Sequence, residues 1–572
     1  MNRLHALPDP RLAPEAWIVR PPAPLAASLA DASSAPTPLA GLHFAVKDNI
    51  DVAGLTTTAG CPAFSYAATE SATVVRRLLD AGALLEGKTN LDQFACGLNG
   101  TRSPYGVVPN AFNPHYVSGG SSSGSAYVVA TGQVDFALGT DTAGSGRVPA
   151  GLNNIVGLKP SRGLISTAGV VPAARSVDVV SIFARTVPVA WRVLQAAAGS
   201  DPRDPYSRTL TWRATPFPAQ PRIGIPDKLE FFGDRLAEAA FDEALQRLRA
   251  LGATITRIPY APLARAAELL YGSALVAERH AAIRPFFDAH ESEVIEPVRS
   301  IIGAARRFSA TDVFDAQAQL QALAQQVRPM WNDIDLLVVP TAPTQVSIEA
   351  MQTDPVELNR CLGHYTNFVN LLDYAALSVP SSIRADGLPF GITLIAPAGA
   401  DWPLVEFGTR YHAATGLTLG ATAQTLSADD CLPPPPPDTE PSVRVAVVGA
   451  HLSGMPLNGQ LTERGARLIK RSRTAPHYRL YALANTQPPK PGLLRVATGE
   501  GTAIEVEIWQ MPQSAYGSFV ALIPSPLGIG SLELEDGDAV QGFVCEPYAL
   551  TGAQDISNHG GWRAFLASRR AA

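Results

Sequence analysis

Cysteine is scarce and scattered in this sequence. Five cysteines occur among 572 residues, none in a CxxC pair, at Cys61, Cys96, Cys361, Cys431 and Cys545. An odd number without paired spacing implies neither a disulfide framework nor a zinc site. We therefore expect buried free thiols, and no metal or other cofactor.

Charge of either sign and long apolar runs are also limited. Lys and Arg number 45 against 51 Asp and Glu, the formal net charge is -6, and no Lys/Arg block occurs. This pattern offers no electrostatic footprint for nucleic acid or an anionic membrane. No uncharged apolar run is long enough to span a bilayer, and residues 1–8 lack the apolar stretch of a secretion signal. We expect a cytoplasmic protein whose partners are small molecules or proteins.

The patterning predicts two domains of different class. A chain of 572 residues exceeds one ordinary hydrophobic core. An apolar strand at 42–46 and a helix at 72–81 begin an alternation typical of an α/β fold. The proline run at 433–437 favours a stiff extended segment. We predict an α/β domain with a mixed sheet surrounded by helices (1–432, core about 41–418), a linker (433–441) and a smaller β-rich α+β domain (442–572).

Further elements follow from hydrophobic periodicity. Helices are expected at 234–252, 261–291 and 311–331, and residues 203–230 are interpreted as a proline-rich surface connection. Strands of the first domain are expected at 336–341, 378–380 and 391–395. In the second domain they are expected at 443–448, 478–483, 504–509 and 540–544.

Residues 82–89 match the phosphate-binding pattern GxxxxGK[ST] letter for letter. A genuine phosphate loop follows a strand and opens a helix, so that backbone N–H groups face the phosphates. Here a helix precedes the motif and its interior reads as strand. Glu86 also places a carboxylate where phosphate charge would lie. We therefore do not predict a nucleotide site.

Two clusters of small residues indicate chemistry. Residues 119–125 read Gly-Gly-Ser-Ser-Ser-Gly-Ser, and residues 139–146 read Gly-Thr-Asp-Thr-Ala-Gly-Ser-Gly. The segment between them reads as buried helix followed by buried strand. Glycine lets backbone N–H groups approach a reacting atom closely. An oxyanion hole is therefore expected from the backbone of Thr142, Ala143, Gly144 and Ser145.

A serine nucleophile needs a base. No histidine occurs between His115 and His280, so a base that is local in sequence is not an imidazole, although a distant one stays open. Lys47 follows an apolar strand, where desolvation would lower its pKa, and a second serine could bridge the two. Separately, a GGSSSGS run is as often a linker, and a lysine after a strand is usually a solvated cap. Their combination indicates a catalytic site.

In order and spacing, Lys47 and residues 119–126 and 139–145 resemble the amidase signature family. The likeness extends from about Gly41 to Thr418. It includes Asn113-Pro114, residues 157–161 and residues 388–391.

The resemblance implies a Ser-Ser-Lys triad. Ser145 would attack the amide carbonyl, and Lys47 would be the general base and acid. Ser121, held by a cis peptide bond in that family, would relay the proton between them. Ammonia would leave as the acyl-enzyme forms, and water would then resolve the ester. Gly120 would contribute to substrate binding, and the remaining serines of the first cluster (Ser122, Ser123 and Ser125) would be hydrogen-bonding scaffold.

Substrate choice depends on features outside the triad. Tyr271 and Arg279 lie about two turns apart on an expected helix. By physics alone they would be a core aromatic and a solvated or salt-bridged arginine. The pair is similar to the Tyr/Arg couple that grips the substrate carboxylate in allophanate hydrolases, and a guanidinium fork suits a planar carboxylate. Residues 447–458 also resemble the start of the C-terminal domain of that family, whose fold is similar to gamma-glutamyl cyclotransferases.

This second resemblance implies a two-step reaction in urea degradation. The first domain would release ammonia from allophanate, and the second would assist decarboxylation of N-carboxycarbamate. His451 is the candidate residue there, because a loop histidine can titrate near neutral pH; His477, His559 and Glu507 are weaker candidates. A biotin-dependent urea carboxylase would act upstream, and a homodimer is expected.

Two alternatives stay open. The chain could be a general small-amide amidase or an enzyme similar to the amidase component of an amidotransferase. The C-terminal domain could be a docking or oligomerisation module without chemistry.

Overall fold

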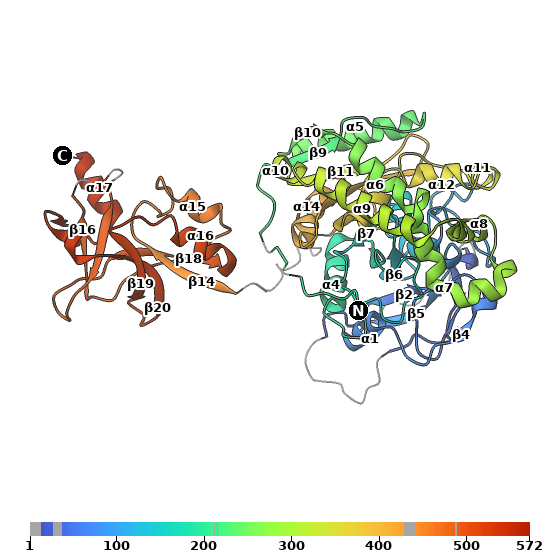
Figure 1. The fold of residues 1–572 in the computed structure, drawn as a ribbon, viewed down its shortest axis with the longest axis horizontal. Helices are drawn as coiled ribbons and strands as arrows, with labels where there is room; N and C mark the ends of the chain where they lie inside the picture. The colour runs from blue at the N-terminus through green and yellow to red at the C-terminus, as the bar shows by residue number, and fades with distance from the viewer. Residues whose placement is uncertain are drawn as a thin grey trace. The chain divides into compact units, whose positions relative to one another are not determined.

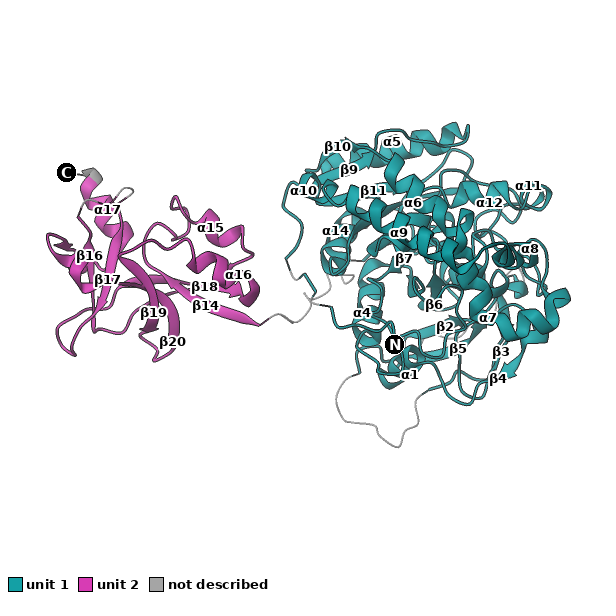
Figure 2. Cartoon of the chain, viewed as in Figure 1, with its two compact units in different colours: residues 1–437 teal, residues 438–572 magenta. Residues whose placement is uncertain are grey.

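The computed structural model describes residues 13–26, 37–210, 212–213, 215–427, 441–484, 486 and 489–571. The chain forms two compact units, residues 1–437 and 438–572 (Figure 2). Most of the proline-rich linker predicted at 433–441 lies outside the described residues, as does Cys431. The other four cysteines are buried free thiols.

The first unit is built on an 11-stranded mixed sheet with helices around it (Figure 1). Its order is β1 (Trp17–Val19), β5 (Leu84–Thr89), β2 (His43–Lys47), β6 (Phe136–Asp141), β8 (Val179–Ala184), β7 (Val156–Lys159), β12 (Tyr374–Ile383), β13 (Pro389–Pro397), β11 (Leu336–Pro340), β9 (Arg222–Pro226) and β10 (Thr254–Ile258). The predicted fold class is confirmed.

Helices surround the sheet of this unit (Figure 1). They include α1 (Thr73–Asp80), α2 (Ser123–Ala130), α3 (Val148–Leu152), α4 (Val187–Ala197), α5 (Arg235–Ala250), α6 (Ala261–Gly272), α7 (Ala277–His290), α8 (Val298–Gly303), α9 (Ala310–Val327), α10 (Met330–Asp333), α11 (Ile348–Thr353), α12 (Glu357–Leu362), α13 (Asn367–Leu371) and α14 (Asp401–Ala413). Caps set their starts: Asp234 accepts from the Ala237 N–H before α5, and Ser309 and Asp312 form a capping box at α9.

Two sequence expectations need correction here. The connection predicted at 203–230 contains β9, which pairs in parallel with β10 and β11. It was missed because flanking prolines hide its two buried isoleucines, Ile223 and Ile225.

The single helix predicted at 261–291 is broken into α6, a short 3-10 turn and α7. Ser273 is extended at the break, and its hydroxyl accepts from the Leu275 N–H, as a capping residue does. Tyr271 and Arg279 therefore lie on two different helices.

The sheet brings the two motif regions together. Strand β2 lies between β5 and β6 and runs parallel to both, with Val46 opposite Leu138 in β6. The carboxyl ends of parallel strands meet at one edge of a sheet. Lys47, the last residue of β2, therefore lies beside the end of β6, where the second cluster begins.

The second unit is β-rich, as predicted. Its sheets are ordered β15-β18-β14-β20-β19 and β17-β16-β21, and three helices accompany them. The bounds are β14 (Ser442–Val447), α15 (Gly459–Thr462), β15 (Arg467–Arg473), β16 (Tyr478–Ala482), β17 (Pro491–Arg495), β18 (Glu505–Pro512), α16 (Gln513–Val520), β19 (Leu527–Glu533), β20 (Ala539–Cys545), β21 (Gln554–Asp555) and α17 (Trp562–Ala571). It has its own apolar core, which includes Val445, Ile508 and Trp562. Among the described residues of the whole chain, no helix has both the length and the apolar character needed to cross a membrane.

Candidate functional site

Lys47 is fully buried at the end of β2. Its Nζ lies 2.7 Å from Ser121 Oγ and 2.8 Å from Thr140 Oγ1. Burial lowers the pKa of Lys47 to about 7, with a further lowering by the charge of Arg279, while Asp92, Asp178 and Asp141 oppose the shift. A large fraction of this amine is therefore neutral near pH 7 and able to accept a proton.

Ser121 is presented by a tightly fixed loop. The Gly120-Ser121 peptide bond is cis. The Asp92 N–H donates to the Ser121 carbonyl at 3.0 Å, and the Asp92 carboxylate accepts from the N–H groups of Gly100 and Arg102. A Cβ at Gly120 would collide with that carboxylate, so the position admits only glycine.

Ser145 lies on the turn that follows β6, and 2% of it is exposed. Its Oγ donates to the Gly97 carbonyl at 3.3 Å. The Asp141 carboxylate fixes the turn: its two oxygens accept from the Gly144 and Gly146 N–H groups at 2.9 and 3.0 Å. Arg147 donates to both of these oxygens. Burial opposes ionisation of Asp141, but the charge and hydrogen bonds of Arg147 outweigh it and leave the pKa of this carboxyl lowered.

These contacts decide which backbone donors are available for an oxyanion. Gly144 was expected among them, yet its N–H is committed to Asp141. Among the described residues, the N–H groups of Thr142, Ala143 and Ser145 have no acceptor. The geometry therefore favours these three as the donors.

A buried carboxylate supports the turn from a second side. Asp178 accepts from Thr142 Oγ1 at 2.6 Å and from the N–H groups of Ala173 and Ala174. Burial raises the pKa of Asp178 to about 6, and these hydrogen bonds oppose the rise.

Tyr271 and Arg279 meet because the helix between them is broken. Eight residues along a continuous helix span about 12 Å, too far for a direct contact. With the break at Ser273, Arg279 Nη2 donates to Tyr271 Oη at 2.8 Å, and its guanidinium carbon lies 4.9 Å from the ring centroid. The family resemblance drew attention to this pair, and the structure brings the two side chains into contact, but the continuous helix predicted at 261–291 was wrong.

Arg279 retains unused donors. The residue is 3% exposed, and its Nε and Nη1 have no hydrogen-bond partner among the described residues. Leaving a buried guanidinium unpaired is costly, which points to an anionic ligand that completes it.

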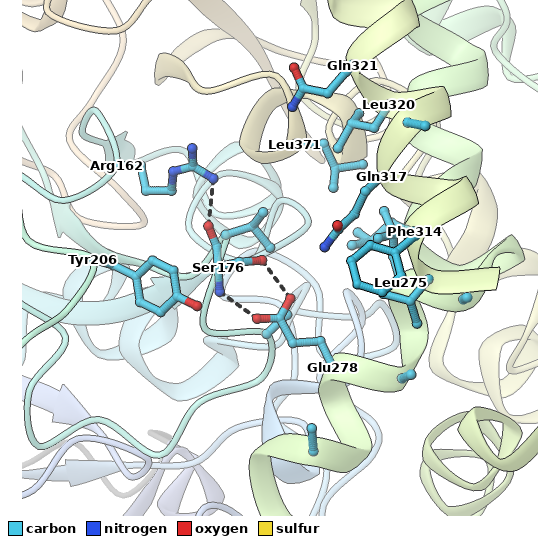
Figure 3. Close-up of a pocket in the computed structure, with 18 residues that line it drawn as sticks. Arg162, Ser176, Tyr206, Leu275, Glu278, Phe314, Gln317, Leu320, Gln321 and Leu371 are labelled. Carbon is cyan, nitrogen blue, oxygen red and sulfur yellow. Dashed lines mark hydrogen bonds between the residues drawn. The ribbon is translucent and has the colours of Figure 1, made fainter. Parts of the chain in front are cut away.

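A cavity of about 740 Å³ adjoins this region (Figure 3). Its walls come from α6, α7, α9 and the segment at 174–177. Glu278, next to Arg279, accepts from the Ser176 N–H at 2.7 Å and from Ser176 Oγ at 2.6 Å, which ties α7 to that segment. Several lining side chains also belong to the apolar cluster around Ala143, so the cavity lies close to the turn that carries Ser145.

The phosphate-binding pattern is not built as a phosphate loop. Residues 84–89 form β5, and α1 precedes them. Lys88 is buried, with Nζ 3.0 Å from Asp48 Oδ1 and 2.6 Å from Thr57 Oγ1. The positive charge of Lys88 is therefore paired with the Asp48 carboxylate and does not serve a phosphate group.

In the second unit, His451 lines a cavity of about 160 Å³ together with Gln460 and Lys490. His451 Nε2 lies 2.9 Å from Gln460 Oε1, and its ring stacks on Phe543 at 5.1 Å. Because an amide oxygen only accepts, Nε2 carries the proton and Nδ1 is left as the basic nitrogen. Burial lowers the pKa of His451, so the ring is neutral at pH 7.

The other C-terminal candidates are only partly gathered around His451. Glu507 is buried and accepts from the N–H and Oγ of Ser453, two residues from His451, and pairs with Arg563 at 2.9 Å. Burial raises the pKa of Glu507, but these partners outweigh it and hold the pKa low. His477 stacks on Tyr478, and His559 lies against Phe565.

Several residues that shape the site were not predicted. They are Thr140, Asp141, Arg147, Asp178, Thr366 and Asn370. Asp141 and Arg147 had a local signal, since Asp141 lies within the second cluster and Arg147 directly follows it. Thr366 and Asn370 lie more than 200 residues away and had none.

Two family profiles match this chain. The one described as Amidase matches residues 18–405, and the one described as Allophanate hydrolase C-terminal domain matches residues 443–567. Among solved structures, Kluyveromyces lactis allophanate hydrolase is 43% identical with a TM-score of 0.84, and the match covers 94% of this chain and 90% of that one.

Curated relatives match over different lengths. Urea amidolyase of Saccharomyces cerevisiae is 45% identical over 542 residues, which is 92% of this chain and 30% of the relative. This chain thus spans under a third of that protein. A glutamyl-tRNA(Gln) amidotransferase subunit of Symbiobacterium thermophilum is 36% identical over 415 residues, 66% of this chain and 83% of the relative.

Proposed function

We propose that this chain, which belongs to the amidase family and carries an allophanate hydrolase C-terminal domain, hydrolyses the C–N bond of allophanate and releases ammonia. The observation that carries the substrate assignment is the buried Arg279 guanidinium with two unpartnered nitrogens. Allophanate ends in a planar carboxylate, which a guanidinium fork binds through two hydrogen bonds. The similarity to Kluyveromyces lactis allophanate hydrolase supports the same substrate.

Acylation uses the Lys47 end of the sheet. Lys47 accepts a proton from Ser121, which in turn takes the proton of Ser145 as Ser145 Oγ bonds to the amide carbon. The oxyanion is stabilised by N–H groups of the turn at 142–145. Collapse of the intermediate breaks the C–N bond, and the proton held by Lys47 returns to the leaving nitrogen to give ammonia. Water then attacks the acyl-enzyme and gives its proton to Lys47 through Ser121. The bond to Ser145 Oγ breaks and N-carboxycarbamate is released.

The second unit acts on that product. His451 is neutral and borders a small cavity, so its Nδ1 is placed to exchange a proton with a bound acid. We assign it to the decarboxylation of N-carboxycarbamate, in a domain with a gamma-glutamyl cyclotransferase-like fold. The urea amidolyase relatives support a link to urea carboxylase upstream. We also propose that the protein is a homodimer located in the cytoplasm.

Ammonia release from allophanate beside malonamate, acetamide and glutamine tests the assignment. We expect the largest kcat/KM for allophanate. The amidotransferase relatives, which match without the second unit, make glutamine the informative competitor. A larger kcat/KM for glutamine or acetamide would favour the alternative of a general amidase or an amidotransferase component.

Replacing Arg279 by glutamine should lower kcat/KM for allophanate by about 10²- to 10³-fold, the range for removing one partner of a buried charge pair. The loss should be smaller than tenfold for acetamide, which lacks a carboxylate. Arg284→Gln on the exposed side of α7 is the matched control and should leave both rates unchanged. Equal losses for the two substrates would show that Arg279 supports the fold and does not read the carboxylate.

Replacing His451 by alanine should slow carbon dioxide release at least about tenfold and leave the first ammonia unaffected. Complete turnover gives two ammonia per allophanate, whereas arrest at N-carboxycarbamate gives one. The early ammonia yield, followed with a coupled assay, should therefore approach one per allophanate. His559→Ala, which changes a ring packed on Phe565, is the control. Full yields from a chain truncated after Thr439 would favour a non-catalytic second unit.

A further inference from the structure

We infer that Thr366 is a positioning residue that holds the Ala143-Gly144 peptide group in the orientation the reaction needs. Thr366 lies just before α13 and is fully buried. Its Oγ1 donates to the Ala143 carbonyl at 2.6 Å across a separation of 223 residues in sequence. The inference rests on the proposed role of Ser145 as nucleophile.

The opposite side of the same peptide group is also fixed. The Gly144 N–H donates to Asp141 Oδ1 at 2.9 Å, and Arg147 Nη2 donates to the same oxygen at 2.9 Å. Arg147 Nη1 then donates to the backbone carbonyl of Thr366 at 3.2 Å. The hydrogen bonds form a closed ring that begins and ends on Thr366.

This restraint has a reason in the backbone itself. Gly144 has φ of +131°, a conformation that glycine adopts freely, so the backbone of this residue does not by itself hold the Ala143-Gly144 peptide group in one orientation. A Cβ at Gly144 would collide with Thr366 Oγ1, which means that the threonine occupies the space a side chain would have filled. Thr366 therefore supplies a restraint on the orientation of the Ala143-Gly144 peptide group that the glycine backbone does not provide.

The orientation matters because a peptide group has two opposite dipole ends. The C=O and N–H of a trans peptide point in opposite directions. Rotation of the Ala143-Gly144 group would break both of its hydrogen bonds and turn the Ala143 carbonyl oxygen toward the Asp141 carboxylate, which now accepts from the Gly144 N–H. The neighbouring N–H groups of Ala143 and Ser145 would then lose the fixed orientation in which they can stabilise a developing oxyanion.

Asn370, from the same segment, anchors the peptide group between Asp141 and Thr142. Its Nδ2 donates to the Asp141 carbonyl at 2.7 Å and to the Val177 carbonyl at 3.0 Å, and its Oδ1 accepts from Arg147 at 3.0 Å. The Asp141-Thr142 peptide group is thereby also fixed, which directs the Thr142 N–H away from Asn370. Segment 366–370 thus holds alternate peptide groups of the turn.

The test measures how fast Ser145 reacts with a fluorophosphonate probe in the full chain. In this step a bond forms from Ser145 Oγ to phosphorus, the P–F bond breaks, fluoride leaves and the serine proton passes toward Lys47. Thr366→Val keeps the shape and removes the donor, Thr366→Ala removes the donor without added bulk, and Thr366→Ser keeps the hydroxyl. Peptide mapping identifies the labelled residue.

We expect the second-order labelling rate to fall by about 10- to 100-fold for the valine and alanine variants and to stay within about threefold for serine. For any amide substrate, kcat should fall and KM should stay unchanged. Wild-type labelling at a residue other than Ser145 would defeat the proposed function. Labelling of Ser145 at the wild-type rate in the valine or alanine variant, or a serine variant as slow as alanine, would overturn the role of Thr366. If the valine variant does not fold, alanine against serine decides.

Discussion

Ser145→Ala is expected to abolish ammonia release from allophanate, with kcat falling by at least about 10⁴-fold. The reason is that the acyl-enzyme cannot form without the Ser145 oxygen, and the remaining groups offer only binding and oxyanion stabilisation. The measurement is steady-state ammonia release at saturating allophanate, with circular dichroism to establish that the variant is folded. Intact-mass analysis of the variant should show no acyl adduct.

Ser123→Ala is the matched control. Ser123 lies in the first cluster and is as buried as Ser145, but its Oγ has no hydrogen-bond partner among the described residues. Its loss should change kcat by less than about threefold, as expected for a side chain outside the chemistry. If Ser145→Ala kept more than a hundredth of wild-type activity while Ser123→Ala lost more, the nucleophile would have to be sought in the first cluster.

Lys47→Met is expected to lower kcat/KM by about 10³- to 10⁵-fold at pH 7, because it removes the base and leaves a side chain of similar length. The pH dependence follows from the buried amine. Only neutral Lys47 accepts a proton, and burial places its pKa at about 7. Wild-type kcat/KM should therefore rise as pH increases through 7 and level off above it.

In Lys47→Met this rise should disappear from the residual activity. A matched control is Lys228→Met, which changes an exposed lysine and should keep both the rate and the rise. Near-normal activity of Lys47→Met at neutral pH, or an unchanged rise in its pH profile, would remove Lys47 from the role of base.

The sequence allowed much of the fold and the chemical core of the site to be predicted, for a physical reason. Strands β2 and β6 are apolar runs that end in polar residues, and strand ends in a parallel pair must lie together. Lys47 and the two small-residue clusters were therefore recognisable from local pattern. The family resemblance then assigned them distinct roles.

What the sequence could not supply are contacts that depend on the tertiary fold. Thr366 and Asn370 are ordinary polar residues at the edge of a five-residue helix, and nothing local indicates that they face the turn at 141–146. The Gly144 N–H could be placed only once the Asp141 carboxylate was seen to accept from it. Long-range packing brings Thr366 and Asn370 to the turn, whereas the Asp141–Gly144 contact is local and depends on how the turn folds.

The meeting of Tyr271 with Arg279 illustrates the same limit. Helical periodicity across 261–291 hides the break, because alanine and leucine continue on both sides of Ser273. The resemblance to allophanate hydrolases drew attention to the pair, but the predicted continuous helix would have kept them apart. The unpaired guanidinium that supports carboxylate recognition became visible only with its burial.

The most direct test of the central claim is the ratio of kcat/KM for allophanate to that for biuret with the wild-type chain. The two molecules share the H2N–CO–NH–CO framework, and biuret carries an amide where allophanate carries its carboxylate. If Arg279 reads that carboxylate beside the Ser145 turn, allophanate should be preferred by at least about 10²-fold. A ratio near one, or a preference for biuret, would contradict the account.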